Sequence, residues 1–150
     1  MKLFRFRLQK YLDLNKEQED AKRLKLHRAQ LVYKKESGKL ESIDSKIEST
    51  VDYTKTARQN QLNIEMMLLA ESYYHVLLEQ RAVQATMVEN AQQQVTAEQK
   101  VLISIQRRRK MLERLKGKKW EAYYQGLLQE EQKELDEIGR VRFCRQQGGS

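Results

Sequence analysis

The chain is divided by the stretch Arg58-Gln-Asn-Gln-Leu-Asn-Ile-Glu-Met-Met67, which is the best candidate for a break between two long helical segments. Asn63 can cap a following helix, because its side-chain oxygen accepts a hydrogen bond from a free backbone N–H of the first helical turn. Leu62 and Met67 stand at the spacing of a hydrophobic staple, which fixes the direction in which the chain enters a helix. We therefore expect a second helix that begins near Ile64.

A heptad frame can be followed through the segment before this break. Its positions alternate spacings of four and three residues, which is the pattern of a coiled-coil seam. Several of them are polar, so the seam is weak near the N-terminus. Ser37-Gly38 lowers helix propensity by about 1 kcal/mol at the glycine, but the frame continues in phase beyond it. The seam positions are Leu8, Leu12, Asn15, Glu19, Lys22, Leu26, Ala29, Tyr33, Glu36, Leu40, Ile43, Ile47, Thr50, Thr54 and Ala57.

The segment after the break carries two adjacent apolar rows, which together make a wider face than one seam needs. The first row consists of Leu69, Tyr73, Val76, Val83, Met87, Ala97, Val101, Met111 and Leu115. The neighbouring row consists of Val88, Ala91, Val95, Leu102, Ile105 and Leu112. The helical pattern then persists through Trp120, Tyr124, Leu127, Leu135 and Ile138.

These patterns predict an all-α fold, a long antiparallel two-helix coiled-coil hairpin with an extended C-terminal helix, in a single domain of residues 1–150. We expect a first helix at about 4–60, a turn at about 59–63, a second helix at about 64–142 and a disordered tail at 143–150. The absence of proline removes the commonest helix breaker, and six glycines are too few for sandwiches, barrels or alternating α/β folds. A parallel homodimer of one long bent helix is the competing architecture.

The turn position fixes an approximate register, in which residue i lies beside about residue 125 minus i. Segment 1–28 then lies against about 97–124, and the chain beyond Tyr124 forms an overhang. Of the formal charge of +8, residues 1–28 carry +5 and residues 100–119 carry +8, offset by acidic segments elsewhere. The two basic blocks should therefore meet at the open end of the hairpin. They form either a solvated face or a positive pole that attracts an acidic protein surface, nucleic acid or phosphate.

The sequence lacks the residue groupings of common catalytic, phosphate-binding and metal sites. An extended hairpin also has no cleft to desolvate reactants, so we expect no enzymatic activity, no cofactor and no metal. His27 and His75 are isolated, and Cys144 is the single cysteine, which fits a reducing compartment. The longest apolar run, Met66 to Ala70, is far short of the roughly 20 residues that span a bilayer. We expect a soluble chain with no signal peptide and no direct membrane insertion.

The run Arg107-Arg108-Arg109-Lys110 has the charge of a nucleic-acid-binding arm. It lies within helical periodicity, however, and lacks the interleaved aromatic residues of single-strand binders. An acidic surface on a partner protein would suit it as well. A basic helical nucleic-acid-binding protein is therefore the alternative function, although no nucleic acid is the expected partner. A steep dependence of binding on salt would distinguish the alternative.

At both ends the sequence resembles the FliJ family of flagellar type III export proteins. The opening Phe4-Arg-Phe-Arg-Leu-Gln-Lys-Tyr-Leu12, followed by Glu17-Gln-Glu-Asp-Ala21, is similar to the start of the family's first helix. The more specific matches are Leu112-Glu-Arg-Leu-Lys-Gly-Lys-Lys-Trp-Glu-Ala-Tyr-Tyr124 and Glu131-Gln-Lys-Glu-Leu-Asp-Glu-Ile-Gly-Arg-Val-Arg142. Gly117 departs from the family pattern, which tends to have an ordinary helix former there.

The resemblance implies a non-enzymatic stalk and coupling protein, similar to the central stalk of rotary ATPases, whose paired termini insert into the ring of the hexameric flagellar export ATPase. It also implies contact with the cytoplasmic domain of the export gate FlhA and, in some relatives, with substrate chaperones. The location would be cytoplasmic, peripheral at the inner face of the cell membrane through the export apparatus. A relative in a virulence secretion system would share this mechanism. The expected ATPase-binding residues are Arg7, Leu8, Leu12, Arg107, Arg108, Arg109, Lys110, Arg114, Leu115, Lys118, Trp120 and Tyr124.

A cluster of large residues, Tyr73, Tyr74, Leu77 and Leu78, follows just after the turn. It spans more of the helix circumference than one facing helix can cover, so part of it should stay exposed as a docking patch. The alternative is seam packing by Tyr73 and Leu77, with Tyr74 and Leu78 half-buried. The resemblance places the gate-binding region here and implies Tyr73, Tyr74, Leu78 and Arg81 as its residues.

Overall fold

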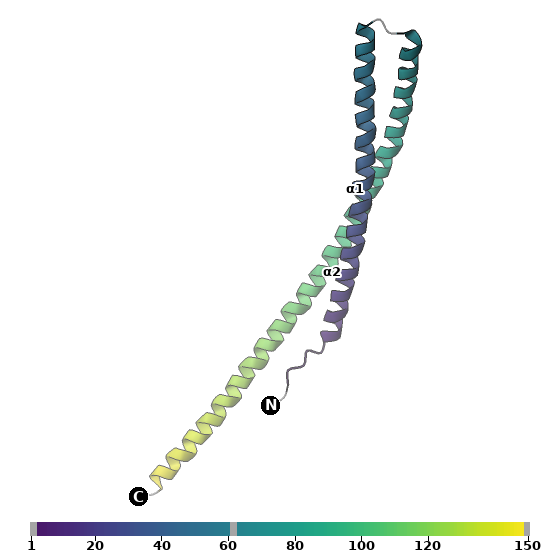
Figure 1. The fold of residues 1–150 in the computed structure, drawn as a ribbon. Coiled ribbons are helices and arrows are strands. Elements are labelled where there is room, and N and C mark those ends of the chain that lie inside the picture. Colours follow the sequence, from purple (N-terminus) through teal and green to yellow (C-terminus); the bar gives the residue numbers. More distant parts are fainter. Residues whose placement is uncertain (1–2, 61–62, 149–150) are drawn as a thin grey trace. The chain divides into compact units, whose positions relative to one another are not determined.

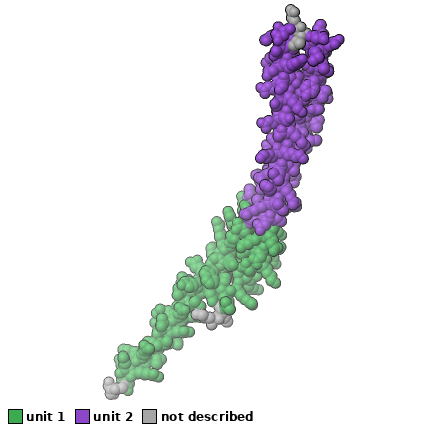
Figure 2. Space-filling view, in the orientation of Figure 1, with its two compact units in different colours: residues 1–18, 105–150 green, residues 19–104 purple. Residues whose placement is uncertain are grey.

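The computed structural model describes residues 3–60 and 63–148; 94% of these residues are helical, and no strand occurs among them. α1 spans Gln9–Gln59 and α2 spans Ile64–Gln147 (Figure 1). The predicted all-α class with two long helices is confirmed. The chain divides into two compact units (Figure 2), and the single domain expected from the sequence stays a prediction. The hairpin unit comprises residues 19–104, and the terminal unit comprises residues 1–18 and 105–150.

Asn63 caps α2 at its first turn. The backbone N–H of Glu65 donates to Asn63 Oδ1 at 3.2 Å, and the N–H of Met66 donates to the Asn63 carbonyl oxygen at 3.1 Å. These bonds satisfy donors that have no partner within the helix, which explains why α2 begins at Ile64. Leu62 lies outside the described residues, so its staple with Met67 stays a prediction.

Within the hairpin unit, α1 and α2 run antiparallel side by side (Figure 1). Every predicted seam position of α1 from Glu19 to Ala57 is buried or half-buried, and the helix continues through Gly38. Small residues, among them Ala29 and Ala91, are buried in this seam. The heptad pattern predicted for α1 therefore identifies its buried and half-buried positions from Glu19 to Ala57.

The seam of α2 is the neighbouring row, which contains Val88, Ala91 and Val95. Ala91 and Val95 are buried and Val88 is half-buried, whereas Leu69 and Val83 of the first row are 64% and 60% exposed. The two rows lie about 100° apart around the helix, and α1 presents only one row, so it can cover only one. In the hairpin unit the first row is thus an exposed face, which the sequence did not predict.

A polar contact within the seam fixes the register of the hairpin unit. Gln84 is 8% exposed, and its Nε2 donates to the carbonyl oxygen of Glu36 at 2.9 Å and to Glu36 Oε2 at 2.6 Å. Lys39 Nζ donates to Glu36 Oε1 at 2.9 Å. The bonds from Lys39 and then Gln84 hold the pKa of Glu36 below its ordinary value. Nearby, Arg81 pairs with Asp44 at 2.6 Å, which is the partner that the predicted register gives.

In the terminal unit, the chain before α1 packs against α2 instead of extending the helix. Phe4 makes an edge-on ring contact with Trp120, with centroids 5.1 Å apart, and a tilted contact with Tyr123 at 5.5 Å. α1 therefore begins at Gln9 and not near residue 4. Aromatic pairs of this kind stabilise by about 0.5–1.5 kcal/mol beyond their buried area, which offsets the helical turn that is not formed.

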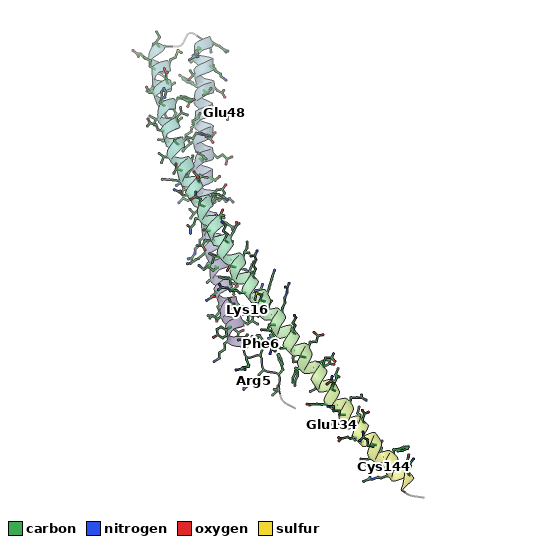
Figure 3. The ribbon with its side chains drawn as sticks, turned by 180° about the vertical axis from the view of Figure 1, so that it is seen from behind. Arg5, Phe6, Lys16, Glu48, Glu134 and Cys144 are labelled. Atoms are coloured by element: carbon green, nitrogen blue, oxygen red, sulfur yellow. The ribbon has the colours of Figure 1, made fainter. Side chains whose placement is uncertain are left out.

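The other end of the terminal unit is a long stretch of α2 without a neighbour. α2 continues through Gly139 to Gln147, so residues 143–147 are helical where a disordered tail was predicted. A glycine costs only about 1 kcal/mol in a helix interior, which is too little to end this one. Residues 128–147 are all exposed, and no other described segment lies beside the stretch that carries Glu134 and Cys144 (Figure 3).

The antiparallel pairing can be tested by cross-linking. Cysteines in place of Asp44 and Arg81, in a Cys144→Ser background, should be joined within one chain by a short bismaleimide, because the native side chains meet across the seam. The yield should be the same at every protein concentration. A control pair at Asp44 and Lys100 should not react within one chain. Product that is only intermolecular, and that increases with concentration, would support the parallel homodimer.

The Glu36 contact predicts a dependence of stability on pH. A carboxyl whose folded pKa is lowered stabilises the fold above its unfolded pKa, and this contribution is lost as the pH falls through the folded pKa. Glu36→Gln should therefore lower the free energy of unfolding in urea at pH 7, and the difference from wild type should shrink below about pH 4. Glu41→Gln, at an exposed position of α1, is the control. A difference that stays constant down to pH 2.5 would contradict the contact.

Candidate functional site

The terminal unit brings the two basic blocks of the sequence together. One groove in it is lined by Arg5, Phe6, Arg7 and Leu8 from the N-terminal segment and by Leu115 and Lys119 from α2. Residues 105–119 alone carry eight Lys or Arg side chains and one glutamate. The predicted meeting of the two blocks is therefore confirmed within this unit.

A second groove in the same unit has an apolar floor and a cationic rim. Its volume is about 740 Å³. Leu8 and Tyr11 of the N-terminal part and Met111, Leu112 and Leu115 of α2 provide the apolar surface. The cations around it are Arg108, Arg114 and Lys118. Apolar area for burial surrounded by one sign of charge is suited to a helix or loop of a partner protein that is acidic at its edges.

Most residues predicted to bind the ATPase are accessible in the terminal unit. The exposed ones are Arg7, Arg107, Arg108, Lys110, Arg114, Leu115, Lys118, Trp120 and Tyr124. Leu8 is half-buried and lines both grooves. The arrangement places these side chains on one unit but does not identify what binds them.

Two of the predicted residues have structural roles instead. Leu12 is 2% exposed and is part of the core, so it cannot contact a partner. Arg109 is half-buried, and its Nη1 donates to both carboxylate oxygens of Glu113 at 3.0 and 2.9 Å. Both lie on the seam row, whose side chains turn toward the other helix. The basic run is thus split, with Arg108 on the groove and Arg109 in the packing.

Tyr11, Met111 and Leu112 line this groove, although they were not predicted from the sequence to be binding residues. Tyr11 and Met111 each precede a seam position by one residue, so they stand beside the seam and line its edge. That offset was visible in the heptad frame, but it could not be interpreted before the seam row of α2 was known. Trp120 and Tyr123 were likewise not assigned to the ring contact with Phe4.

A second candidate site lies near the turn, on one side of the hairpin unit. A groove of about 540 Å³ is lined by Val51, Thr54, Lys55 and Arg58 of α1 and by Ile64, Met67, Leu68, Glu71 and Tyr74 of α2. Leu78 lies seven residues after Glu71 and therefore on the same side of α2. We call this side the Leu78 face; it includes the ion pair between Arg81 and Asp44.

The structure separates the predicted gate-binding cluster. Leu77 is 2% exposed and is part of the seam, and Tyr74 is half-buried beside the groove of the Leu78 face. Tyr73 is 47% exposed and lines a different groove with Leu69, so its predicted alternative role in the seam is wrong. Of the predicted residues, Tyr74, Leu78 and Arg81 therefore share one side and Tyr73 does not.

The described part of the chain holds neither a cluster of metal ligands nor a membrane-spanning helix. No group of three or more His, Cys, Asp or Glu side chains within it is placed to hold a metal ion. Within the same residues, no helix combines the length and the apolar character that crossing a bilayer requires.

The comparison with known families gives one match. The family model of the flagellar FliJ protein matches residues 4–148. No curated protein and no solved structure matches significantly. The family match covers both helices and both candidate sites. The chain therefore belongs to the FliJ family of flagellar proteins.

Proposed function

We propose that the protein is a non-enzymatic stalk and coupling component of flagellar type III protein export. Its family makes it a coiled-coil protein related to flagellar export, and the proposal adds the partners. In this proposal the terminal unit inserts into the ring of the hexameric export ATPase and promotes its assembly or activity. The observation that best supports this proposal is that the terminal unit combines basic grooves, built from both ends of the chain, with a helical extension that packs on no other described segment of that unit.

The extension explains why the unit needs a partner. Residues 128–147 form a helix of about 30 Å without packing on any other described segment. Packing of an apolar side supplies most helical stability in proteins, and this stretch lacks such packing. Leu128, Leu135 and Ile138 are exposed and are available for such packing. Enclosure within a ring would supply it.

The basic grooves also support the proposal that the terminal unit is the part that contacts the ATPase. Clustered cations speed the diffusional encounter with an acidic surface and orient it, whereas the apolar floor supplies area to bury after contact. The rim cations Arg108, Arg114 and Lys118 would steer, and Leu8, Tyr11 and Leu115 would be buried.

The Leu78 face supports a second contact, with the cytoplasmic domain of the export gate FlhA. Leu68 and Leu78 are 59% and 38% exposed, and Tyr74 provides an aromatic side chain between them. Local clusters of this kind are the usual anchors of protein interfaces. Through these two contacts the protein would be cytoplasmic and peripheral to the membrane, with substrate chaperones as further partners. The family match gives no support to the alternative of a nucleic-acid-binding protein.

The ATPase contact can be tested by charge reversal. Arg108→Glu, Arg114→Glu and Lys118→Glu together should slow association with the ATPase at least ten-fold and flatten its dependence on salt, because these cations surround the groove. Lys25→Glu, Arg28→Glu and Lys35→Glu change the net charge equally in the hairpin unit and serve as the control. Binding kinetics and ATPase rate are the measurements. Stimulation that survives both the first reversal and deletion of residues 124–150 would refute this contact.

The gate contact predicts a separate phenotype. Leu68→Ala with Leu78→Ala should weaken binding to the isolated cytoplasmic domain of the gate about ten-fold or more and abolish motility, since interface anchors cost about 2 kcal/mol or more on truncation. Helix content by circular dichroism and ATPase stimulation should stay near normal. Val83→Ala with Met87→Ala, on another side of α2, is the matched control. Unchanged affinity of the first double variant would remove the Leu78 face from the proposal.

A further inference from the structure

The exposed row of α2 that contains Leu69 and Val83 has the spacing of a second seam, which the hairpin unit does not use. Its positions alternate spacings of three and four residues and each precedes a seam position by one, so they form a continuous stripe beside the seam. The stripe contains no charged residue, although 33% of the chain is charged. We call this stripe the second row, because it lies beside the seam row and is not the seam itself. It consists of Met66, Leu69, Tyr73, Val76, Gln80, Val83, Met87, Asn90, Gln94, Ala97 and Val101.

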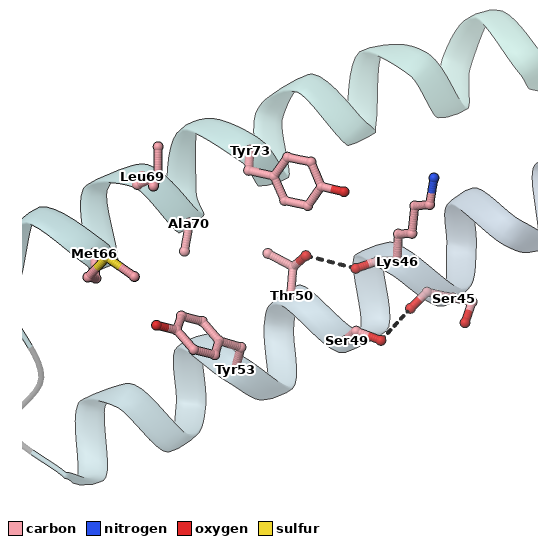
Figure 4. Close-up of a pocket in the computed structure, with 9 residues that line it drawn as sticks. All are labelled: Ser45, Lys46, Ser49, Thr50, Tyr53, Met66, Leu69, Ala70 and Tyr73. Atoms are coloured by element: carbon pink, nitrogen blue, oxygen red, sulfur yellow. Dashed lines mark hydrogen bonds between the residues drawn. The ribbon is translucent and has the colours of Figure 1, made fainter.

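A groove between the two helices shows which residues of α1 lie beside the second row. This groove has a volume of about 570 Å³, and Met66, Leu69 and Tyr73 line it together with Lys46 and Tyr53 of α1 (Figure 4). Four residues of α1 with hydroxyl groups line it, and two of these hydroxyls donate to their own helix. Thr50 Oγ1 donates to the Lys46 carbonyl oxygen at 2.8 Å, and Ser49 Oγ donates to that of Ser45 at 2.9 Å. An apolar occupant would therefore leave these two hydroxyl donors paired.

The wall that α1 contributes is basic along its length. Lys46 and Ser49 line the groove, and residues seven, fourteen or twenty-one positions earlier fall on the same side of a coiled-coil helix. Those positions hold Lys39, Val32 and Lys25 in one series and Ser42, Lys35 and Arg28 in the other. All five cations of this wall are exposed; Lys39 is paired with Glu36 at 2.9 Å, and no acidic residue occupies the positions of the two series. We call Lys25, Arg28, Lys35, Lys39 and Lys46 the basic row.

We propose that the second row and the basic row together bind an amphipathic helix of another protein, with an apolar stripe against α2 and acidic residues on the flank that faces α1. The spacing of the second row matches the knobs that a coiled-coil partner inserts. The row extends over about 50 Å, which accommodates a helix of some 30 residues. The opposite flank of α2 carries Glu65 and Glu79, so acidic residues on only one flank of the ligand are accommodated.

A second copy of the chain fits this surface less well. Each copy carries a formal charge of +8, so two docked hairpins would repel each other, and both basic rows would lie in the same complex. The flank of α2 that a second copy offers has two glutamates and also Lys100, against five cations. The charges therefore favour a foreign acidic helix.

The inference goes beyond the proposed contacts with the ATPase and the gate, because its residues lie elsewhere. The second row is on the side of Lys46 and Tyr53, whereas the Leu78 face is on the side of Lys55 and Arg58. The two surfaces flank the seam on opposite sides. One hairpin can therefore hold both ligands without competition for the same residues.

The probe for this site is a synthetic 28-residue helical peptide with leucine at a, alanine at d, glutamate at e and glutamine elsewhere. A control peptide has lysine at e. The full-length protein should bind the acidic peptide in fluorescence anisotropy, with affinity that falls at least ten-fold from 50 to 300 mM salt. It should bind the lysine peptide at least ten-fold more weakly.

Two variants test the two rows. Val76→Gln with Val83→Gln should weaken binding of the acidic peptide about ten-fold, and Arg28→Glu with Lys35→Glu and Lys46→Glu should weaken it further and reduce the salt dependence. Lys34→Glu with Lys55→Glu and Arg58→Glu, an equal charge change on the opposite side, should leave affinity within two-fold. Circular dichroism verifies that each variant is folded.

Three outcomes would overturn the proposal. The first is equal binding of the two peptides, and the second is equal loss of affinity in the two lysine-reversal variants. The third is a dimer in sedimentation velocity that forms with increasing protein concentration and is abolished by the Val76 and Val83 changes, because the second row would then be covered by another copy of the chain. Because the measurements use no ATPase and no gate, failure here leaves the proposed function standing.

Discussion

The pairing of one row of α1 with one row of α2 determines what every other surface of the protein can do. In the hairpin unit this pairing is held in register by Gln84, whose amide reaches both the backbone and the carboxylate of Glu36. A slip of one residue would turn the seam residues toward solvent and leave the Gln84 amide without its partners, which costs about 1–3 kcal/mol for a buried polar group. Once the register is set, the second row and the Leu78 face must lie on opposite sides of the seam.

The seam of α1 could be predicted from sequence and that of α2 could not, for a physical reason. α1 has a single row with the right spacing, so periodicity alone identifies the buried positions, including polar ones such as Thr50 and Glu36. α2 has two rows of nearly equal quality, and a helix paired with one neighbour can bury only one of them. Nothing in the spacing distinguishes Val83 from Val88. What decides is the fit against α1, where small residues such as Ala91 are buried.

The same limit applies to the helix ends and to the candidate sites. The start of α1 depends on Phe4 reaching Trp120, a contact between residues far apart in sequence that no local propensity encodes. The end of α2 was predicted near Arg142 because of Gly139, but a glycine costs only about 1 kcal/mol, which is too little to end a long helix. The basic run was visible in the sequence, but its division between groove and seam was not. That division follows from the register, which places Arg108 outward and Arg109 beside Glu113.

The polar residues of the seam also explain why the chain pairs its own two helices. In a parallel homodimer each seam residue faces its own copy, so Glu36 would meet Glu36, Lys22 would meet Lys22 and Arg81 would meet Arg81. Like charges at one level of a seam repel, and Glu36 and Arg81 would also lose the partners that they have in the hairpin. In the antiparallel arrangement Glu36 meets Gln84 and Asp44 meets Arg81. A seam that is too polar for a tight dimer is therefore suited to a hairpin, where different residues face each other and polar groups can be matched. The same polarity limits how much apolar surface the hairpin buries within itself and leaves the second row of α2 for a partner.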